Sequence, residues 1–209
     1  MSLLEHEHAA WASGRLLIGI DEVGRGPLAG PVVAGACCFA IGHGGIVGVR
    51  DSKQVKRPAE RQSLARSIRA EALAWGLGAA SVAEIERLNI RRATALAMQR
   101  ALVHCRRMLG GEVSVLVLVD GMPVPELGMP HRALVKGDSH CHAIAAAALL
   151  AKVARDRLMG SLGARRPGYG WESNMGYGSA GHMDAIRLQG MTPHHRRLFC
   201  RGVVGQGLG

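Results

Sequence analysis

Short apolar runs bounded by glycine, proline or acidic residues alternate along this chain with longer segments of helical periodicity. Continuous apolar runs of this kind are typical of strands that are buried on both faces of a sheet. The most apolar run, VSVLVLV, leads directly into Asp120 and Gly121. The pattern predicts strands over residues 15–21, 31–40, 76–81, 113–119 and 133–136.

Three longer segments carry the helical pattern. Pro58 suits a first helical turn, and apolar residues follow it at helical spacing as far as Trp75. Further helices are predicted over residues 85–109, stopped by two glycines, and over residues 139–159, where many alanines permit close packing on a sheet. The order of these elements predicts an α/β fold, a mixed β-sheet flanked by helices with a small helical C-terminal appendage.

The composition of the 209 residues, 48% hydrophobic and 20% charged, is that of a folded globular domain and excludes extensive disorder. No internal repeat, linker or low-complexity segment divides the chain. We expect an N-terminal tail over residues 1–14, a main domain over residues 15–159 and a basic segment over residues 160–209 that packs on the same domain.

The charge balance indicates a polyanionic partner. The 26 Lys and Arg residues outnumber the 16 Asp and Glu residues, which gives a formal net charge of +10. Nucleic acid is the first candidate for such a partner. Only 3% of the residues are aromatic, so the stacking of single-stranded bases has few side chains to use. A protein that follows the backbone of a duplex fits this composition better.

The cysteines and the apolar segments indicate the cellular compartment of the protein. Five cysteines without a C-x-x-C pair are typical of reduced thiols in a cytoplasmic protein. Residues 26–49 carry no Asp, Glu, Lys or Arg, but Pro27, Pro31 and several glycines would break a helix in lipid. The charged N-terminus lacks a secretion signal. We therefore expect a cytoplasmic monomer with no membrane association.

Four acids stand at the ends of predicted elements. Asp21 and Glu22 follow the first strand, Asp120 follows the most apolar strand, and Asp138 precedes the alanine-rich helix. Carboxylates that gather in one place repel one another unless they are protonated or neutralised by a cation. Oxygen ligands without His or Cys favour Mg²⁺ or Mn²⁺. In a basic protein this chemistry indicates phosphodiester cleavage assisted by two metal ions.

Each acid also has a structural interpretation. Asp120 suits a turn, Asp138 suits a helix N-cap, and Asp21 with Glu22 suits a polar strand exit. Consecutive residues of a strand point to opposite faces, so Asp21 and Glu22 reach one site only if the strand ends or twists there, as Gly24 allows.

The glycines of this region also imitate a dinucleotide-binding fingerprint. Gly24, Gly26 and Gly30 follow a predicted strand. The next segment begins with Pro31 and is extended, however, whereas the fingerprint requires a helix N-terminus for the pyrophosphate. The fingerprint is therefore the weaker interpretation.

A series of motifs in fixed order resembles one known family. The motifs are GIDEVGRGPLAGP at residues 19–31, DSK at 51–53, NIRRAT at 89–94, VDG at 119–121, KGDS at 136–139, AKVARDR at 151–157, GYGSAGH at 176–182 and TPHHRR at 192–197. Over roughly residues 15–200, the chain resembles type 2 ribonuclease H, the bacterial ribonuclease HII family.

The resemblance implies a ribonuclease H-like catalytic domain at residues 15–159 and a substrate-binding segment at residues 160–209. It implies an endoribonuclease that hydrolyses the RNA strand of RNA/DNA hybrids. Such an enzyme also cuts on the 5′ side of single ribonucleotides in duplex DNA and leaves a 3′-hydroxyl and a 5′-phosphate. The implied catalytic and metal-binding residues, with Mg²⁺ or Mn²⁺ as cofactor, are Asp21, Glu22, Asp120 and Asp138.

The resemblance also implies how the ribose is recognised. Gly24, Arg25 and Gly26 match the family's loop that senses the 2′-hydroxyl at an RNA-to-DNA junction. Tyr177 matches the family's tyrosine that packs on the sugar at that junction. Glycines let a sugar edge approach the backbone, and the 2′-hydroxyl is the group that separates RNA from DNA.

Basic residues extend the expected substrate surface. Residues 157–201 hold seven Arg and three His against two acids, a balance that suits phosphate binding. We expect phosphate contacts from Lys53, His182, His195 and Arg196, the alternative being a solvated basic surface.

The sequence departs from the family after Asp138. Where many relatives carry a lysine and serines, this chain has His140, Cys141 and His142. Residues so close on a helix do not face one zinc site. Two other functions stay open at this point: a DNA nuclease or junction resolvase of the same broad fold, and a non-catalytic hybrid-binding protein.

Overall fold

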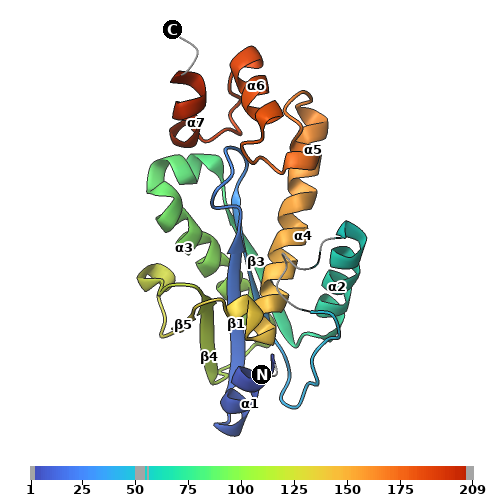
Figure 1. Ribbon diagram of the computed structural model, residues 1–209. Coiled ribbons are helices and arrows are strands. Elements are labelled where there is room, and N and C mark those ends of the chain that lie inside the picture. Colours follow the sequence, from blue (N-terminus) through green and yellow to red (C-terminus); the bar gives the residue numbers. More distant parts are fainter. Residues whose placement is uncertain (1–2, 50–54, 56, 206–209) are drawn as a thin grey trace.

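A mixed five-stranded sheet in the order β3-β2-β1-β4-β5 forms the centre of the molecule (Figure 1). The structure is a computed structural model, and it describes residues 3–49, 55 and 57–205. Strand β1 pairs antiparallel with β2 and parallel with β4. The predicted fold class, a mixed sheet flanked by helices, is confirmed.

The five predicted strands are present, with shifted ends. They are β1 (Leu16–Val23), β2 (Val32–Cys38), β3 (Ala74–Ala80), β4 (Val115–Asp120) and β5 (Arg132–Leu134). The α-helices are α1 (Glu5–Ala12), α2 (Pro58–Glu71), α3 (Val82–Leu109), α4 (His142–Arg165), α5 (Trp171–Asn174), α6 (Ala180–Gln189) and α7 (Arg197–Val204). Two short 3-10 helices are η1 (Pro125–Leu127) and η2 (Gly137–Ser139).

Helices cover both faces of the sheet. Helix α3 packs on β2 and β3, and α4 packs on the other face of β1 and β2. Side chains alternate along β1, so Ile18 and Ile20 enter the core under α3 while Leu17 enters the core under α4. Asp21 continues the Leu17 series and therefore faces α4.

Helix α4 lies unusually close to the sheet. A Cβ at Gly19 would stand 2.3 Å from the backbone nitrogen of Ile144, and a Cβ at Gly35 would stand 2.2 Å from the carbonyl oxygen of Ala147. Only glycine on the strand side leaves room for the helix backbone. The close packing predicted from the alanines of α4 is confirmed.

Two predicted helix ends differ from the structure. Helix α2 ends at Glu71 because the backbone becomes extended at Ala72, and Trp75 lies in β3. Helix α4 continues to Arg165, beyond the helix end expected at residue 159. The segment expected to be a tail contains α1, which packs against β1.

Helix α3 contains a break near the acid-rich end of the sheet. Asn89 has a positive φ of 66° with ψ 164°, a conformation that costs about 1–3 kcal/mol in a residue other than glycine. Its Oδ1 accepts a hydrogen bond from the backbone nitrogen of Arg92 at 3.2 Å and so caps the second half of the helix.

The three C-terminal helices gather beyond one end of the sheet, orange to red in Figure 1. They share a small core with the β1–β2 loop and α4, formed among others by Ala29, Met159, Trp171, Ile186 and Cys200. No helix in the described part of the chain combines the length and apolar character needed to cross a membrane.

Replacing Gly35 by Ala should lower the free energy of unfolding by about 1–3 kcal/mol, because the added methyl group displaces the backbone of α4. Gly44→Ala is the matched control, since nothing lies within 4 Å of a Cβ at that exposed position. Urea denaturation of both variants measures the difference. Equal stability of the two would contradict the close approach of α4.

Candidate active site

Two of the predicted acids lie side by side at the carboxyl ends of parallel strands. Ile20 of β1 pairs with Val119 of β4, so the next residues, Asp21 and Asp120, occupy neighbouring positions. Parallel pairing brings equivalent ends of strands to the same edge of a sheet. The sheet therefore joins two acids that are far apart in the sequence.

The third acid reaches the same place from the turn before α4. Asp138 lies in η2, and the carbonyl of Gly137 in that turn accepts hydrogen bonds from the nitrogens of His140 (3.0 Å) and Cys141 (2.8 Å). The nitrogen of Gly137 donates to Oδ1 of Asp120 at 2.6 Å. The turn that carries Asp138 is thus tied to the end of β4.

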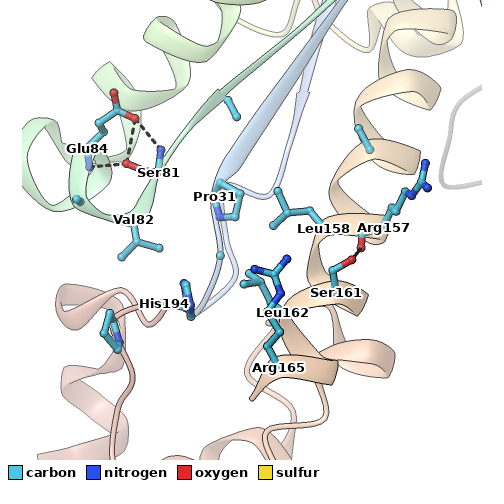
Figure 2. A pocket seen from close by; sticks show the side chains of 15 residues that line it. Pro31, Ser81, Val82, Glu84, Arg157, Leu158, Ser161, Leu162, Arg165 and His194 are labelled. Atoms are coloured by element: carbon cyan, nitrogen blue, oxygen red, sulfur yellow. Dashed lines mark hydrogen bonds between the residues drawn. The ribbon is translucent and has the colours of Figure 1, made fainter. Parts of the chain in front are cut away.

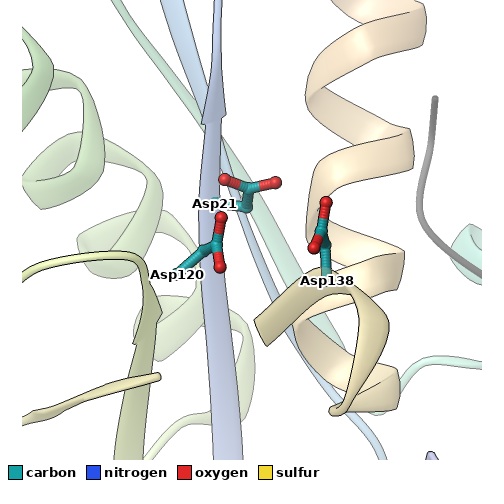
Figure 3. A group of neighbouring side chains, drawn as sticks. All are labelled: Asp21, Asp120 and Asp138. Carbon is teal, nitrogen blue, oxygen red and sulfur yellow. The ribbon is translucent and has the colours of Figure 1, made fainter. Parts of the chain in front are cut away.

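The three carboxylates point toward one another (Figure 3). One oxygen from each of Asp21, Asp120 and Asp138 lies within 4.8 Å of the others, and the side chains of Asp21 and Asp138 are buried. Hard oxygen donors at this spacing, without His or Cys, fit Mg²⁺ or Mn²⁺.

The electrostatics of the group also fit a cation. Burial raises the pKa of Asp21 well above 3.8, and the nearby charges of Glu22, Asp120 and Asp138 raise this pKa further. The ionised carboxylates repel one another, and a bound divalent ion would stabilise them by neutralising that repulsion.

Glu22 lies outside the group of three acids, but its charge acts on that group. Strand β1 continues through Glu22 to Val23, past the strand end expected at Asp21, and the charge of Glu22 raises the pKa of Asp21. Burial raises the pKa of Glu22, while the guanidinium of Arg25, at 3.2 Å from Oε1, opposes that shift. Glu22 and Asp120 both line a neighbouring pocket of about 410 Å³.

The loop after β1 and Tyr177 lie next to each other. Gly24 has a φ of +91°, which favours glycine, and a Cβ at Gly26 would stand 3.9 Å from Cε1 of Tyr177. Tyr177 is 48% exposed, and the side chain of Arg25 is 55% exposed. The structure therefore brings the predicted ribose-sensing residues together on the surface.

Comparison with known proteins places the chain in a family. The family model described as "Ribonuclease HII" matches residues 18–202. A ribonuclease HII from Synechococcus sp. (strain JA-3-3Ab) is 50% identical over 199 residues, covering 94% of this chain and 87% of the relative. The chain belongs to the ribonuclease HII family. It is accordingly a metal-dependent endoribonuclease for RNA/DNA hybrids.

Solved structures share the fold. The ribonuclease H2 from Pyrococcus horikoshii OT3 superimposes with a TM-score of 0.74 at 23% identity, covering 92% of this chain and 98% of that one. A Bst-RNase HIII in complex with Mn²⁺ superimposes with a TM-score of 0.72 at 19% identity, covering 93% of this chain and 70% of that one. The ribonuclease H-like fold that the resemblance implies is confirmed.

Arg196, which we predicted to contact phosphate, instead supports the loop from within. Its guanidinium is fully buried and donates to the carbonyl oxygens of Gly24 (2.6 Å), Arg25 (2.8 Å) and Gly30 (2.8 Å). Burial, together with the nearby charge of Arg155, lowers the pKa of Arg196 to about 10. The prediction is corrected, because charge along the sequence does not distinguish a buried cation from an exposed one.

Arg155 is a second buried arginine of the ribonuclease HII fold, and our sequence analysis missed it. It donates to the carbonyl oxygens of Ala29 (3.2 Å), Pro31 (3.0 Å) and Met175 (3.0 Å). Its place on a helix face between Ala151 and Met159, both buried, was the available signal. The two arginines fix the loop that separates β1 from β2.

His182 and His195 are also buried rather than free to bind phosphate. Their Nε2 atoms lie 3.1 Å apart, and His182 accepts a hydrogen bond from Nε1 of Trp171 at 2.9 Å. Burial lowers the pKa of both rings, that of His195 to about 4. Both predictions of phosphate contact are corrected. The remaining prediction, Lys53, lies outside the described residues.

Of the three residues that the sequence analysis singled out after Asp138, His140 is exposed and the other two face the protein interior. Cys141 and His142 are buried, and Nε2 of His142 accepts a hydrogen bond from the backbone nitrogen of Ile46 at 3.1 Å. Burial lowers the pKa of His142 to about 4. Within the described residues these side chains join no group that could hold a metal ion.

Another pocket is lined by Ser81, Leu158 and His194, among others, and by none of the three acids (Figure 2). It has a volume of about 780 Å³ and lies between the start of α3 and the C-terminal half of α4. Its one acid, Glu84, already accepts hydrogen bonds from Ser81 and Arg100.

Asp21→Asn should stabilise the protein in EDTA at pH 7 by about 1 kcal/mol or more, because it removes a buried charge whose pKa is raised. A carboxyl group whose pKa is raised in the folded state contributes its full stabilisation below about pH 4. That stabilisation is lost as the pH rises through the pKa of the folded state. The advantage of the variant should therefore vanish at low pH. Urea denaturation at both pH values measures it, and a less stable variant at pH 7 would contradict the repulsion.

Arg196→Lys should lower the free energy of unfolding by about 2 kcal/mol or more, because one ammonium cannot replace a guanidinium that serves three buried carbonyls. Arg201→Lys, at an exposed position of α7, is the control and should change little. Chemical denaturation compares the two. If both substitutions have a similarly small effect, Arg196 does not support the loop.

Proposed function

We propose that this ribonuclease HII incises duplex DNA on the 5′ side of single embedded ribonucleotides, leaving a 3′-hydroxyl and a 5′-phosphate. The observation that carries the proposal is the exposed ring of Tyr177 beside Gly26, on the loop that begins three positions after Asp21. A sugar held between that ring and the glycine backbone would place its 2′-hydroxyl against the loop.

We place two divalent ions at the acids. Asp21, Asp120 and Asp138 would hold one ion, and the pocket shared by Asp120 and Glu22 would hold the other. Such ions supply Lewis acidity, which activates an attacking water and offsets the charge that develops on the phosphate. Both Mg²⁺ and Mn²⁺ suit these ligands, and the related Bst-RNase HIII is known in complex with Mn²⁺.

The residues of the chain have separate tasks in this scheme. The carboxylates fix the ions, while Arg155 and Arg196 hold the loop in one conformation so that the ribose meets a preformed surface. Arg25, paired with Glu22, links the ribose-sensing loop to the acids.

The net charge of the protein supports a duplex as its partner, and its cysteines support a location in the cytoplasm. A net charge of +10 favours the phosphate backbone and predicts binding that weakens steeply with salt. All five cysteines are free and buried, as expected of a protein in a reducing compartment. We propose that the enzyme acts as a monomer.

The decisive test incubates the protein with Mg²⁺ or Mn²⁺ and a DNA duplex that carries one ribonucleotide, beside an all-DNA duplex. We expect one cut, 5′ of the ribonucleotide, and none in the control duplex. Asp120→Asn should reduce cleavage by at least about a thousandfold while binding the same duplex with unchanged affinity, because the fold and the basic surface persist.

Other outcomes would reject the proposal in different ways. Equal cutting of both duplexes would indicate a DNA nuclease or junction resolvase, and binding of the hybrid without any cutting would indicate a non-catalytic protein. Retained cleavage by the Asp120 variant would remove that residue from the chemistry.

A further inference from the structure

A buried glutamate from the N-terminal helix contacts the first turn of α4. Glu7 of α1 is 1% exposed. Its Oε1 accepts a hydrogen bond from the backbone nitrogen of Ala143 at 2.7 Å and lies 3.3 Å from Sγ of Cys141, which donates to it. In the same region the backbone nitrogen of His142 donates to the carbonyl oxygen of Leu3 at 2.8 Å. Two adjacent N–H groups of α4 are thus satisfied by the N-terminal segment.

Helix α4 needs this support because its own sequence supplies none. Cys141 stands at the N-cap position without a side-chain capping hydrogen bond, and the first turn of α4 contains no acid. The first N–H groups of a helix have no partner within the helix and require an external acceptor. Glu7 provides that acceptor from 136 positions earlier in the sequence.

Hydrogen bonds connect the first turn of α4 to the acids at which we place the metal ions. The nitrogen of Cys141 donates to the carbonyl of Gly137, and the nitrogen of Gly137 donates to Oδ1 of Asp120. Asp138 lies between these two tied positions. On the other side, the backbone of Ala143 and Ile144 rests against Gly19, two residues before Asp21. A displacement of residues 141–143 would therefore reach all three acids.

The burial of Glu7 is costly by itself. Its second oxygen, Oε2, is buried without a hydrogen-bond partner in the described structure. Unsatisfied buried polar atoms are rare in folded proteins and usually mark a group that is kept for another reason. The geometry of Oε1 supplies such a reason, because it fixes the start of α4.

We infer that Glu7 is a positioning residue for the metal centre: by holding the first turn of α4 it sets the spacing of Asp138 and Asp120, and hence the affinity for divalent ions. This inference rests on the proposed function, which places the ions at those acids. Residues behind metal ligands commonly alter metal affinity by about 10–100-fold.

The test uses the full-length protein with Glu7→Asp, which shortens the reach to Ala143, and Glu7→Gln, which keeps the reach but weakens the acceptor. Glu5→Asp and Glu5→Gln are matched controls at an exposed position of the same helix. Mn²⁺ binding is measured by calorimetry without substrate, below the melting temperature of every variant. The Mn²⁺ dependence of cleavage is measured in parallel.

We expect Glu7→Asp to weaken Mn²⁺ binding about tenfold and Glu7→Gln about threefold, with both Glu5 variants like the wild type. At saturating Mn²⁺, Glu7→Gln should cleave at the wild-type rate, because the ligands themselves are intact. If Glu7→Asp does not fold, the comparison of Glu7→Gln with Glu5→Gln decides the question alone.

Unchanged Mn²⁺ affinity in the folded Glu7 variants, whether or not their melting temperature falls, would overturn the inference and leave Glu7 with a role in stability only. An equal loss in the Glu5 variants would overturn it as well. A wild-type protein that neither binds Mn²⁺ nor cleaves the ribonucleotide-containing duplex would instead reject the proposed function.

Discussion

The repulsion among three neighbouring carboxylates, two of them buried, is the constraint around which this molecule is organised. Asp21, Asp120 and Asp138 come from distant parts of the sequence, yet one oxygen of each lies within 4.8 Å of the others. Like charges so close favour any movement that separates them. The parallel pairing of β1 with β4 and the hydrogen bond from Gly137 to Asp120 prevent that movement. A rigid sheet is thus a requirement of the site.

The loop between β1 and β2 is supported by buried positive charges instead of negative ones. Arg155 and Arg196 are both buried, and each donates to three backbone carbonyls. The partial negative charges of those carbonyls take the place of an acid. Carbonyls hold the loop without adding another full negative charge near the three acids.

Runs and spacings of apolar residues along the sequence predicted the strands and helices that neighbouring residues alone determine. Apolar runs that end in Asp21 and Asp120 identified two strands and their acids, since parallel strands deliver such residues to one edge. The helical spacing that reached Trp75 failed because the backbone becomes extended at Ala72, and spacing alone carries no sign of that change. The predictions for His195 and Arg196 failed for another reason. A cluster of basic residues looks the same in a sequence whether the side chains are buried against carbonyls or exposed to water.

The N-terminal segment shows what sequence patterns miss most. Its acids and histidines are typical of a solvated tail, but Glu7 meets Ala143 only because β1 and α4 bring the two segments together. The partial positive charge at the N-terminus of α4 would oppose cations beside Asp138. The carboxylate of Glu7, which accepts a hydrogen bond from the first turn of that helix, offsets this charge without joining the three acids. The chain therefore compensates for the missing local cap and for the helix dipole with one side chain.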